Sequence, residues 1–478
     1  MVAHNTMNTS KKYLETEIDT RQAMKISVVE GIFAQVHATL TAIGSAFITK
    51  AAIVLQATPM QFSILNGIAQ LSLFFQLYAV KHNEKVSSRK KPCVQFAMIG
   101  RMLSVFLGVC LAIANRELAL YCFLIVLFIS AVFQTISGNM WVAWISDLIP
   151  KRVRGRFFSR RMQINLIFSL AFGYLFTFLI DLFEATSDSW KHALLTKLNL
   201  TKVFVVDNLP VGLAVVFTIG ATFGIYGLLL LKKQPERRII RKEQGTASLL
   251  EPLQNKSFLK LLRFQLWWMF AIGVGAPFWG KFMLSALGMS LVELQLYSML
   301  SAVGMFISFR FWGKFIDKFG NKTAMKLCVL LGAINPAMWI FLTPTNYFLI
   351  FFEAFTSGMM WSGANLITFN FVLAIAPKGK EQHWSAVYSG FGGIMMLTTI
   401  LLSGLLYPKT LVVGNLCLQP EQVLFGLASI FRISAELPLH FVEEPKSTGL
   451  RKTIGYASDY VMAKLMRFRT RMFKIFVD

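Results

Sequence analysis

The sequence predicts an all-α integral membrane protein whose twelve transmembrane helices form two pseudo-repeated halves of six. Three observations predict this class: twelve apolar segments, a one-sided distribution of lysine and arginine, and a faint similarity between the halves. The chain has 478 residues, 55% of them hydrophobic, and a mean hydropathy of +0.56. This composition excludes an ordinary soluble enzyme. Each segment is long enough to cross a hydrocarbon core of about 30 Å. The segments cover 28–55, 62–80, 93–114, 118–146, 162–183, 208–231, 264–287, 292–312, 324–342, 346–376, 384–407 and 421–441.

Lysine and arginine lie almost entirely on one side of this pattern. Of the 48 such residues, 39 lie at the amino terminus, in or beside every second loop, or in the carboxyl tail, whereas five lie in the intervening loops. The positive-inside rule places both termini in the cytoplasm, and we expect a bacterial inner membrane. The net charge of +24 then follows from topology and from attraction to anionic lipids of the bilayer. Because the charges are scattered over short loops, we predict no nucleic-acid partner.

The same pattern divides the chain into five parts. Residues 1–27 form a polar cytoplasmic segment without a signal-peptide core, and residues 28–231 form the first six-helix domain. The polar, basic stretch 232–263 is a cytoplasmic linker to the second six-helix domain, 264–441. The basic tail, 442–478, fits a helix on the inner leaflet and a solvated helix equally well. Since the fold needs no partner subunit, we expect a monomer.

Two short similarities support a duplicated architecture. Leu55–Thr58 follows the first span, and Leu287–Ser290 follows the seventh, 232 residues later. A Pro-Lys pair closes the fourth span at Pro150 and the tenth at Pro377. Duplicated six-helix halves around a central pathway are a transporter architecture.

Two loops on the predicted cytoplasmic side carry more specific signals. In Asp147–Arg161 an acidic residue ends one span, a proline breaks it, and an Arg-Gly-Arg run opens the next. Such a loop suits a switchable contact, since arginine pairs bidentately with carboxylates and glycine permits a tight turn. The loop Gly313–Lys322 reads Gly-x-x-x-Asp-x-x-Gly-x-Lys. With the twelve-span topology, it resembles the signature loop of the major facilitator superfamily.

The resemblance extends over about 28–441. Glu30–Phe33 at the start of the first span and Gly358–Pro377 in the tenth resemble a bacterial branch of this superfamily whose members mostly lack an assigned substrate. Membership implies alternating access by rocking of two six-helix domains. It also implies that the first, fourth, seventh and tenth spans line the cavity. The equivalent loop of the first half, Val80–Lys91, keeps its basic residues but lacks Gly-x-x-x-Asp.

Charged residues inside the apolar spans are candidate functional residues, because a charge in hydrocarbon is costly. We expect Lys50 and Lys281 to bind an anionic group, and Glu353, or Glu30 with His37, to carry a proton. The alternative is that the lysines extend outward to the interface and Glu353 pairs with one of them.

Uncharged candidates lie on the same spans. Gln35 falls near the helical face of Lys50, and Trp141, Trp361 and Asn365 suit a solute with a flat or apolar part and hydrogen-bonding groups. Ordinary helix packing is the alternative for these residues. We assign the two loops to gating, through helix-end dipoles and ion pairs between the domains. The gating candidates are Asp147, Arg154, Gly155, Arg156, Gly313, Asp317, Gly320 and Lys322.

No catalytic or cofactor machinery is predicted. The five cysteines form no Cys-x-x-Cys pair, no His/Cys/Glu cluster has metal-ligand spacing, and there is no phosphate-binding Gly-Lys-Ser/Thr loop. We therefore expect no enzyme, no resident metal and no cofactor. The sequence predicts a secondary active transporter that moves a small solute, anionic or amphiphilic, together with protons. The alternative is a non-transporting membrane sensor on the same scaffold.

Overall fold

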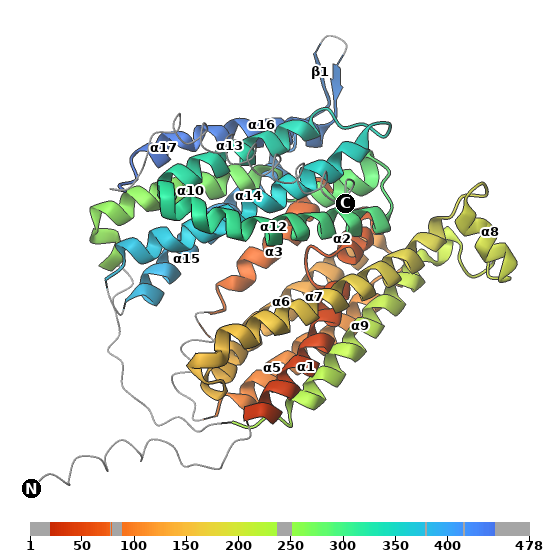
Figure 1. The fold of residues 1–478 in the computed structure, drawn as a ribbon. Coiled ribbons are helices and arrows are strands. Elements are labelled where there is room, and N and C mark those ends of the chain that lie inside the picture. Colours follow the sequence, from red (N-terminus) through yellow and green to blue (C-terminus); the bar gives the residue numbers. More distant parts are fainter. Residues whose placement is uncertain are drawn as a thin grey trace, which may run out of the picture.

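A computed structural model describes residues 20–76, 78, 88–236, 251–377, 380–413 and 416–444, and the fold is almost entirely helical (Figure 1). The predicted segment 1–19 and most of the tail, 445–478, lie outside the described residues, as does 237–250 of the linker. The helices of the first half are α1 (Thr20–Thr41), α2 (Ala46–Val54), α3 (Pro59–Leu73), α5 (Lys90–Cys110), α6 (Arg116–Leu148), α7 (Lys151–Asp181), α8 (Trp190–Lys197) and α9 (Leu209–Leu231).

The second half begins with α10 (Lys256–Gly275) and a short α11 (Trp279–Lys281), which continues as a π-helical turn over Phe282–Ala286. The remaining helices are α12 (Leu291–Phe319), α13 (Asn321–Trp339), α14 (Ile350–Ile375), α15 (Glu381–Leu405), α16 (Pro420–Ser434) and α17 (Glu436–His440). Single 3₁₀ turns cover Leu182–Glu184, Val206–Asn208, Glu251–Gln254 and Tyr347–Leu349. Strands β1 (Leu411–Val413) and β2 (Leu416–Leu418) pair antiparallel in a hairpin that the hydropathy pattern did not predict.

Each of the twelve predicted apolar segments coincides with a helix or a broken pair of helices. Ten spans within the described residues are long and apolar enough to cross a membrane. The other two segments contain α3, which has 15 residues, and α13, which carries Pro336 within it. The all-helical membrane architecture is thus confirmed, with ten of the predicted spans meeting the length and hydropathy required.

The turns that follow the first and seventh spans have the same local structure. Gln56 and Gly288 both adopt a left-handed backbone, with φ of 57° and 67°. Thr58 and Ser290 then cap α3 and α12, and each forms a capping box with the residue three positions later. The box satisfies main-chain N–H groups that would otherwise lack a partner. The short similarity in the sequence therefore encodes the same chain reversal in both halves.

A second local structure is repeated at the other end of each half. The carboxylate of Glu236 accepts hydrogen bonds from main-chain N–H groups at the start of α5, and that of Glu444 does so at the start of α13. Beside them, the ammonium groups of Lys90 and Lys322 donate to main-chain carbonyls, at 2.8 and 2.7 Å. A carboxylate at a helix amino terminus is stabilised by the helix dipole. In both halves, the chain that leaves the sixth span is thereby attached to the third.

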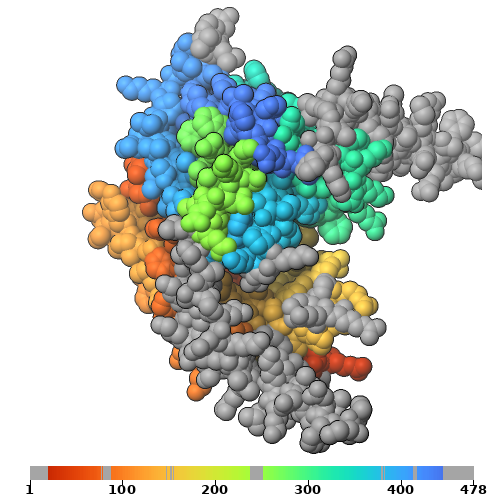
Figure 2. Space-filling model, turned by 90° about the vertical axis from the view of Figure 1, so that its left-hand side faces the viewer, coloured from red at the N-terminus to blue at the C-terminus, as the bar shows by residue number. Residues whose placement is uncertain are grey.

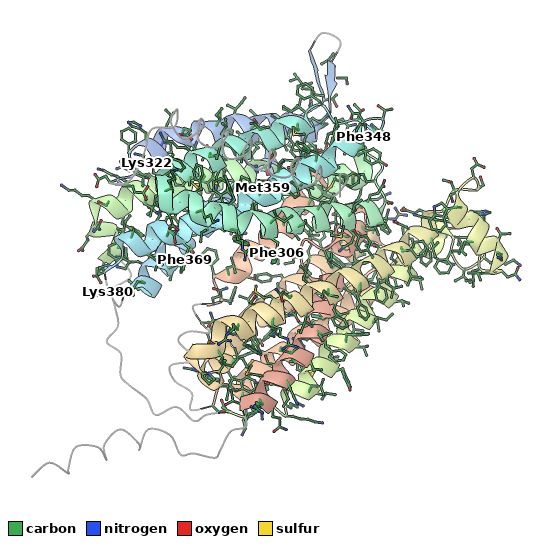
Figure 3. All side chains as sticks on the ribbon, in the orientation of Figure 1. Phe306, Lys322, Phe348, Met359, Phe369 and Lys380 are labelled. Carbon is green, nitrogen blue, oxygen red and sulfur yellow. The ribbon has the colours of Figure 1, made fainter. Side chains whose placement is uncertain are left out.

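The two halves form separate groups of helices that diverge toward one end (Figure 1). At this end, which we call the basic end, lie Lys322 and Lys380, whereas Phe348 lies at the opposite, far end (Figure 3). Seen from the side of the basic end, the first half occupies the lower part of the molecule and the second half the upper part (Figure 2). Helix α3 packs on α15, and α7 packs on α12, across the interface.

The distribution of buried apolar side chains matches this arrangement. One cluster at the far end is continuous across both halves and includes Phe47 and Phe62 with Phe278 and Phe282. Toward the basic end each half has a core of its own, around Trp144 in the first half and in a separate cluster in the second. Apolar burial therefore joins the halves at the far end of the molecule.

Candidate functional site

A cavity of about 580 Å³ lies between the two halves. It lies against the far-end core, where α1 breaks before α2 and α10 breaks before α11. At the first break Gly44 has a φ of +83°, and the hydroxyl of Ser45 caps α2. At the second break Pro277 follows the end of α10. Residues of both breaks line the cavity, and membrane proteins tolerate such irregular backbone where it lines a cavity enclosed by protein. The side chains of the wall come from α1, α2, α3, α7, α11 and α12.

The cavity wall has a polar part and an aromatic part. On the first-half side, the hydroxyls of Thr39 and Ser169 are 2.8 Å apart, and the amide of Gln35 donates to Ser169 at 3.4 Å. On the second-half side, the indole of Trp279 stacks on Phe425 with ring centroids 4.0 Å apart. This combination of an apolar surface with few polar groups is typical of small-molecule sites.

A second pocket, of about 230 Å³, lies within the first half and shares Gln35 with the central cavity. Its charged centre is Glu30, which is 2% exposed. The guanidinium groups of Arg101 and Arg161 each lie 3.3 Å from one carboxylate oxygen of Glu30. Two partly buried cations therefore face a single buried anion, which leaves a net positive charge beside the central cavity.

Local packing holds Arg161 in this pocket. Its guanidinium lies 4.4 Å above the ring of Trp141, and its Nε donates to the main-chain oxygen of Ser27 at 3.0 Å. Gly31 makes this approach possible, because a Cβ there would lie 2.7 Å from a terminal nitrogen of Arg161. The indole N–H of Trp141 and the side-chain oxygen of Asn165 are buried without a hydrogen-bond partner among the residues that the structure describes. One unused donor and one unused acceptor thus belong to residues that line the inner pocket with the three charges.

His37 lies two turns after Glu30 on nearly the same face of α1, and its ring and Arg101 both pack against Gly224. It is 1% exposed, and its nitrogens lie 3.1 Å from the main-chain oxygen of Gly220 and 3.2 Å from the side-chain oxygen of Gln134. Gln134 also lines the inner pocket. His37 is therefore separated from the pocket by one amide side chain.

The two intramembrane lysines each lie against a carboxylate. The ammonium of Lys50 lies 2.6 Å from Glu184, in the 3₁₀ turn after α7, and that of Lys281 lies 2.8 Å from Glu421. Neither lysine is among the residues that line the two pockets. Their assignment as substrate ligands stays a prediction. In this conformation each lysine is neutralised by its own carboxylate partner.

Glu353 lies behind the wall of the central cavity, and is 3% exposed. The hydroxyl of Tyr297, which lines the cavity, donates to Glu353 at 3.1 Å. The alternative predicted from the sequence, an ion pair of Glu353 with Lys50 or Lys281, is not formed, because both lysines have other partners. One tyrosine thus connects this carboxyl group to the cavity.

The remaining predicted site residues lie elsewhere. Trp361 is half-buried against the second-half core, and Asn365 is exposed on α14. The family pattern implies that the tenth span lines the cavity, but this span contributes no side chain to the two pockets. The second, fifth and eighth spans line the central cavity in its place. The first and seventh spans line it as expected, and Trp141 of the fourth lines the inner pocket.

The gating candidates of the second half surround the α12–α13 turn. Gly320, with a φ of +86°, ends α12, and Lys322 opens α13. Gly313 lies in the last turns of α12, where an added Cβ would meet no other atom within 4 Å. The carboxylate of Asp317 is exposed and has no ion-pair partner within the described part of the chain.

In the first half, Arg156 is exposed on α7. Asp147 lies in α6, and Arg154 and Gly155 lie in α7, but their side chains fall outside the described set. Sequence reasoning did not select Arg101 or Arg161 as site residues. It gave Arg101 a structural role on the third span, and it treated Arg161 only as the last residue of the predicted loop Asp147–Arg161. The rule applied to the lysines, that a charge within an apolar span indicates function, also selects Arg101.

The profile of the Major Facilitator Superfamily matches residues 32–400. The chain belongs to this superfamily. No curated protein sequence matches it.

Solved transporter structures share the fold at low sequence identity. A mutant of the nucleoside transporter NupG has a TM-score of 0.64 and 12% identity, over 89% of this chain and all of NupG. The inward-open xylose transporter XylE from E. coli has a TM-score of 0.59 and 13% identity, over 91% of this chain and 98% of XylE. A bacterial metal transporter has a TM-score of 0.58 and 12% identity, over 88% of this chain and 97% of the other. These likenesses confirm the predicted fold.

The family and the apolar helices together identify an integral membrane transporter, as the sequence predicted.

Proposed function

We propose that this transporter moves a small anionic or amphiphilic solute by alternating access, coupled to protons. The observation that carries the proposal is the central cavity, because both halves line it and one continuous apolar core closes it at the far end. The separate cores at the basic end allow the halves to rotate apart there. With both termini cytoplasmic in a bacterial inner membrane, the described conformation would be the inward-facing one, and a monomer suffices.

The inner pocket is the part of the site best suited to an acidic group. Two guanidinium groups share one carboxylate there, so several N–H donors remain available to a second anion. An acceptor on the solute could bind the free indole N–H of Trp141, and a donor could bind the free oxygen of Asn165. Lys50 and Lys281 are less suited in this conformation, since each would first have to leave its carboxylate.

Glu30 provides a physical route for coupling to protons. When Glu30 is ionised it neutralises part of the charge of Arg101 and Arg161. When it is protonated, both arginines become available to a solute anion, so proton binding and anion binding favour each other. His37 and Glu353 are further predicted proton carriers, and Tyr297 would connect Glu353 to the cavity. One structurally similar protein is a D-xylose–proton symporter, which is compatible with coupling on this fold.

Gating would use the exposed carboxylate of Asp317 at the basic end. An anion placed at a helix amino terminus is stabilised by about 0.3–1 kcal/mol at exposed sites and up to about 2 kcal/mol when partly buried. We propose that Asp317 makes such a contact only when the basic end closes. It would then bias the equilibrium between conformers without touching the solute.

The test is uptake of radiolabelled carboxylates (lactate, benzoate and citrate) into proteoliposomes, with and without an imposed pH gradient. We expect uptake of at least one carboxylate, stimulated by an inward proton gradient. The variant Glu30→Gln should lose this stimulation while still binding the solute, because an amide mimics the protonated acid. Glu117→Gln is the matched control, since Glu117 is an exposed acid at the start of α6.

Two results would contradict the proposal. Binding of a carboxylate without any flux would favour the sensor. Equal gradient stimulation in Glu30→Gln and wild type would remove Glu30 from the coupling mechanism.

A further inference from the structure

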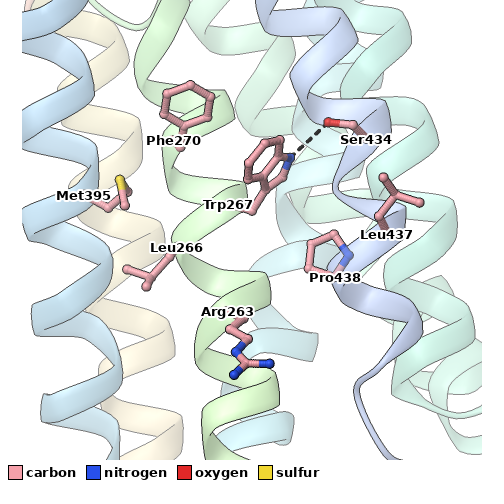
Figure 4. A pocket seen from close by; sticks show the side chains of 8 residues that line it. All are labelled: Arg263, Leu266, Trp267, Phe270, Met395, Ser434, Leu437 and Pro438. Carbon is pink, nitrogen blue, oxygen red and sulfur yellow. Dashed lines mark hydrogen bonds between the residues drawn. The ribbon is translucent and has the colours of Figure 1, made fainter.

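A groove of about 460 Å³ on the surface of the second half is unconnected with the cavities described above. It lies between α10, α15 and the α16–α17 junction, and the side chains of Figure 4 point into it from these helices. Its walls are apolar and in part strongly exposed: Trp267 is 40% and Leu437 70% accessible. A single charged residue, Arg263, lies at one end of the groove (Figure 4). The apolar residues lining it are Leu266, Trp267, Phe270, Met395, Leu437 and Pro438.

The groove arises from a break in the last span. Helix α16 ends at Ser434, and α17 begins two residues later and contains Pro438. Near the break, the main-chain oxygen of Phe431 accepts a hydrogen bond from the Ser434 hydroxyl at 2.9 Å, since an unsatisfied carbonyl facing hydrocarbon would be costly. The indole N–H of Trp267 donates to this oxygen at 3.2 Å and to the Ser434 hydroxyl at 3.0 Å. The indole is therefore held in place, and its ring forms a fixed wall of the groove.

Arg263 is the available charge at the end of this groove. It lies seven residues from the start of α10, or about 10 Å of helix rise. Nearby, Lys260 and Ser257 both bind the carboxylate of Glu443. Arg263 is exposed and has no ion pair or hydrogen bond within the described part of the chain. Because α10 also begins with the exposed Lys256, the local charge stays positive after Glu443 is counted.

We propose that this groove binds an anionic phospholipid, with an acyl chain against Trp267 and Leu437 and the phosphate at Arg263. A guanidinium pairs bidentately with phosphate oxygens, and because Arg263 lies at one end of the groove, it would orient the headgroup toward the basic end. The excess positive charge favours an anionic headgroup over a zwitterionic one. The lipid would occupy the groove that the α16–α17 break leaves open.

The test is native mass spectrometry of the full chain, purified in detergent, titrated with phosphatidylglycerol or with phosphatidylcholine. We expect the wild type to retain one phosphatidylglycerol molecule more tightly than phosphatidylcholine. Arg263→Gln should weaken retention of phosphatidylglycerol about tenfold, and Arg263→Lys should weaken it less. Arg310→Gln, which removes an exposed arginine from α12, is the matched control and should bind as the wild type does. Leu437→Trp should fill the groove and weaken retention of both lipids.

Three outcomes would overturn the proposal. Arg263→Gln could retain phosphatidylglycerol as the wild type does, which would exclude the headgroup contact. Glycerol 3-phosphate could displace the lipid, which would indicate a site for free phosphate esters. The lipid-free chain could be a dimer that Leu437→Trp converts to a monomer, which would make the groove an interface between copies. Thermal unfolding of each variant verifies that the protein tested is folded.

Discussion

A buried carboxylate connects the two halves at the far end, in addition to the apolar core there. Asp181, the last residue of α7, accepts hydrogen bonds from the main-chain N–H groups of Leu291 and Val292, at 2.9 and 3.1 Å. These are the first residues of α12, so a buried anion of the first half caps a helix of the second. Lys191 lies 3.5 Å from the same carboxylate. We predict that Asp181→Asn destabilises the conformation closed at the far end.

The magnitude follows from these contacts. A hydrogen bond to a charged group contributes about 1.5–3 kcal/mol. Asparagine keeps one acceptor but turns an N–H₂ group toward the second main-chain N–H, and it loses its attraction to the helix dipole. The expected loss is about 2 kcal/mol, which shifts the equilibrium between closed and open far ends about thirtyfold.

The assay is a distance measurement between spin labels on Thr196 and Thr345, which are exposed at the far end of the two halves. Cys417 is first replaced by serine, because it is an exposed free cysteine. Asp181→Asn should raise the population of longer distances. Asp188→Asn, which changes an exposed acid in the same region, should leave the distribution as in the wild type. An unchanged distribution in folded Asp181→Asn protein would refute the argument that this cap holds the far end closed.

Two further predictions concern other charged residues. Asp317→Ala should lower the transport rate while leaving solute affinity largely intact, since the carboxylate is exposed and distant from both pockets; paired flux and binding measurements check this, and lost binding with normal conformational exchange would count against a gating role. Lys281→Ala should lower the free energy of unfolding by about 3 kcal/mol, because the side chain of Glu421, 8% exposed, loses its partner. Lys281→Ala together with Glu421→Gln should recover much of this stability, as thermal unfolding would show. Weaker binding of an anionic solute in both the single and the double variant would instead support the role in binding predicted from the sequence.

The positions of the spans could be predicted from the sequence because hydropathy, helix caps and turn chemistry act over a few residues. Each of the twelve apolar segments contains a helix, and the short similarity between Leu55–Thr58 and Leu287–Ser290 corresponds to the same turn in the structure. The Gly313–Lys322 loop predicted the superfamily, which the family profile confirms. The β1–β2 hairpin was missed, because strands of three residues leave no periodic signal.

The candidate site could be predicted only in part. The charges buried in the spans were identifiable one by one, since any charge in an apolar segment is conspicuous. Their pairing was not, because Glu30 pairs with Arg101 and Arg161, which are 71 and 131 residues away in the chain. Lys50, expected to face the solute, meets Glu184 instead.

The sequence by itself therefore determined the class of protein, its spans and the repeated ends of its halves, because these depend on local chemistry along the chain. The tertiary structure decided which charges neutralise one another, which remain free beside a cavity, and which end of the molecule is closed. These outcomes depend on how helices rotate and pack against one another. A rotation of one residue position, about 100° on a helix, moves a side chain from a cavity to a core or to lipid.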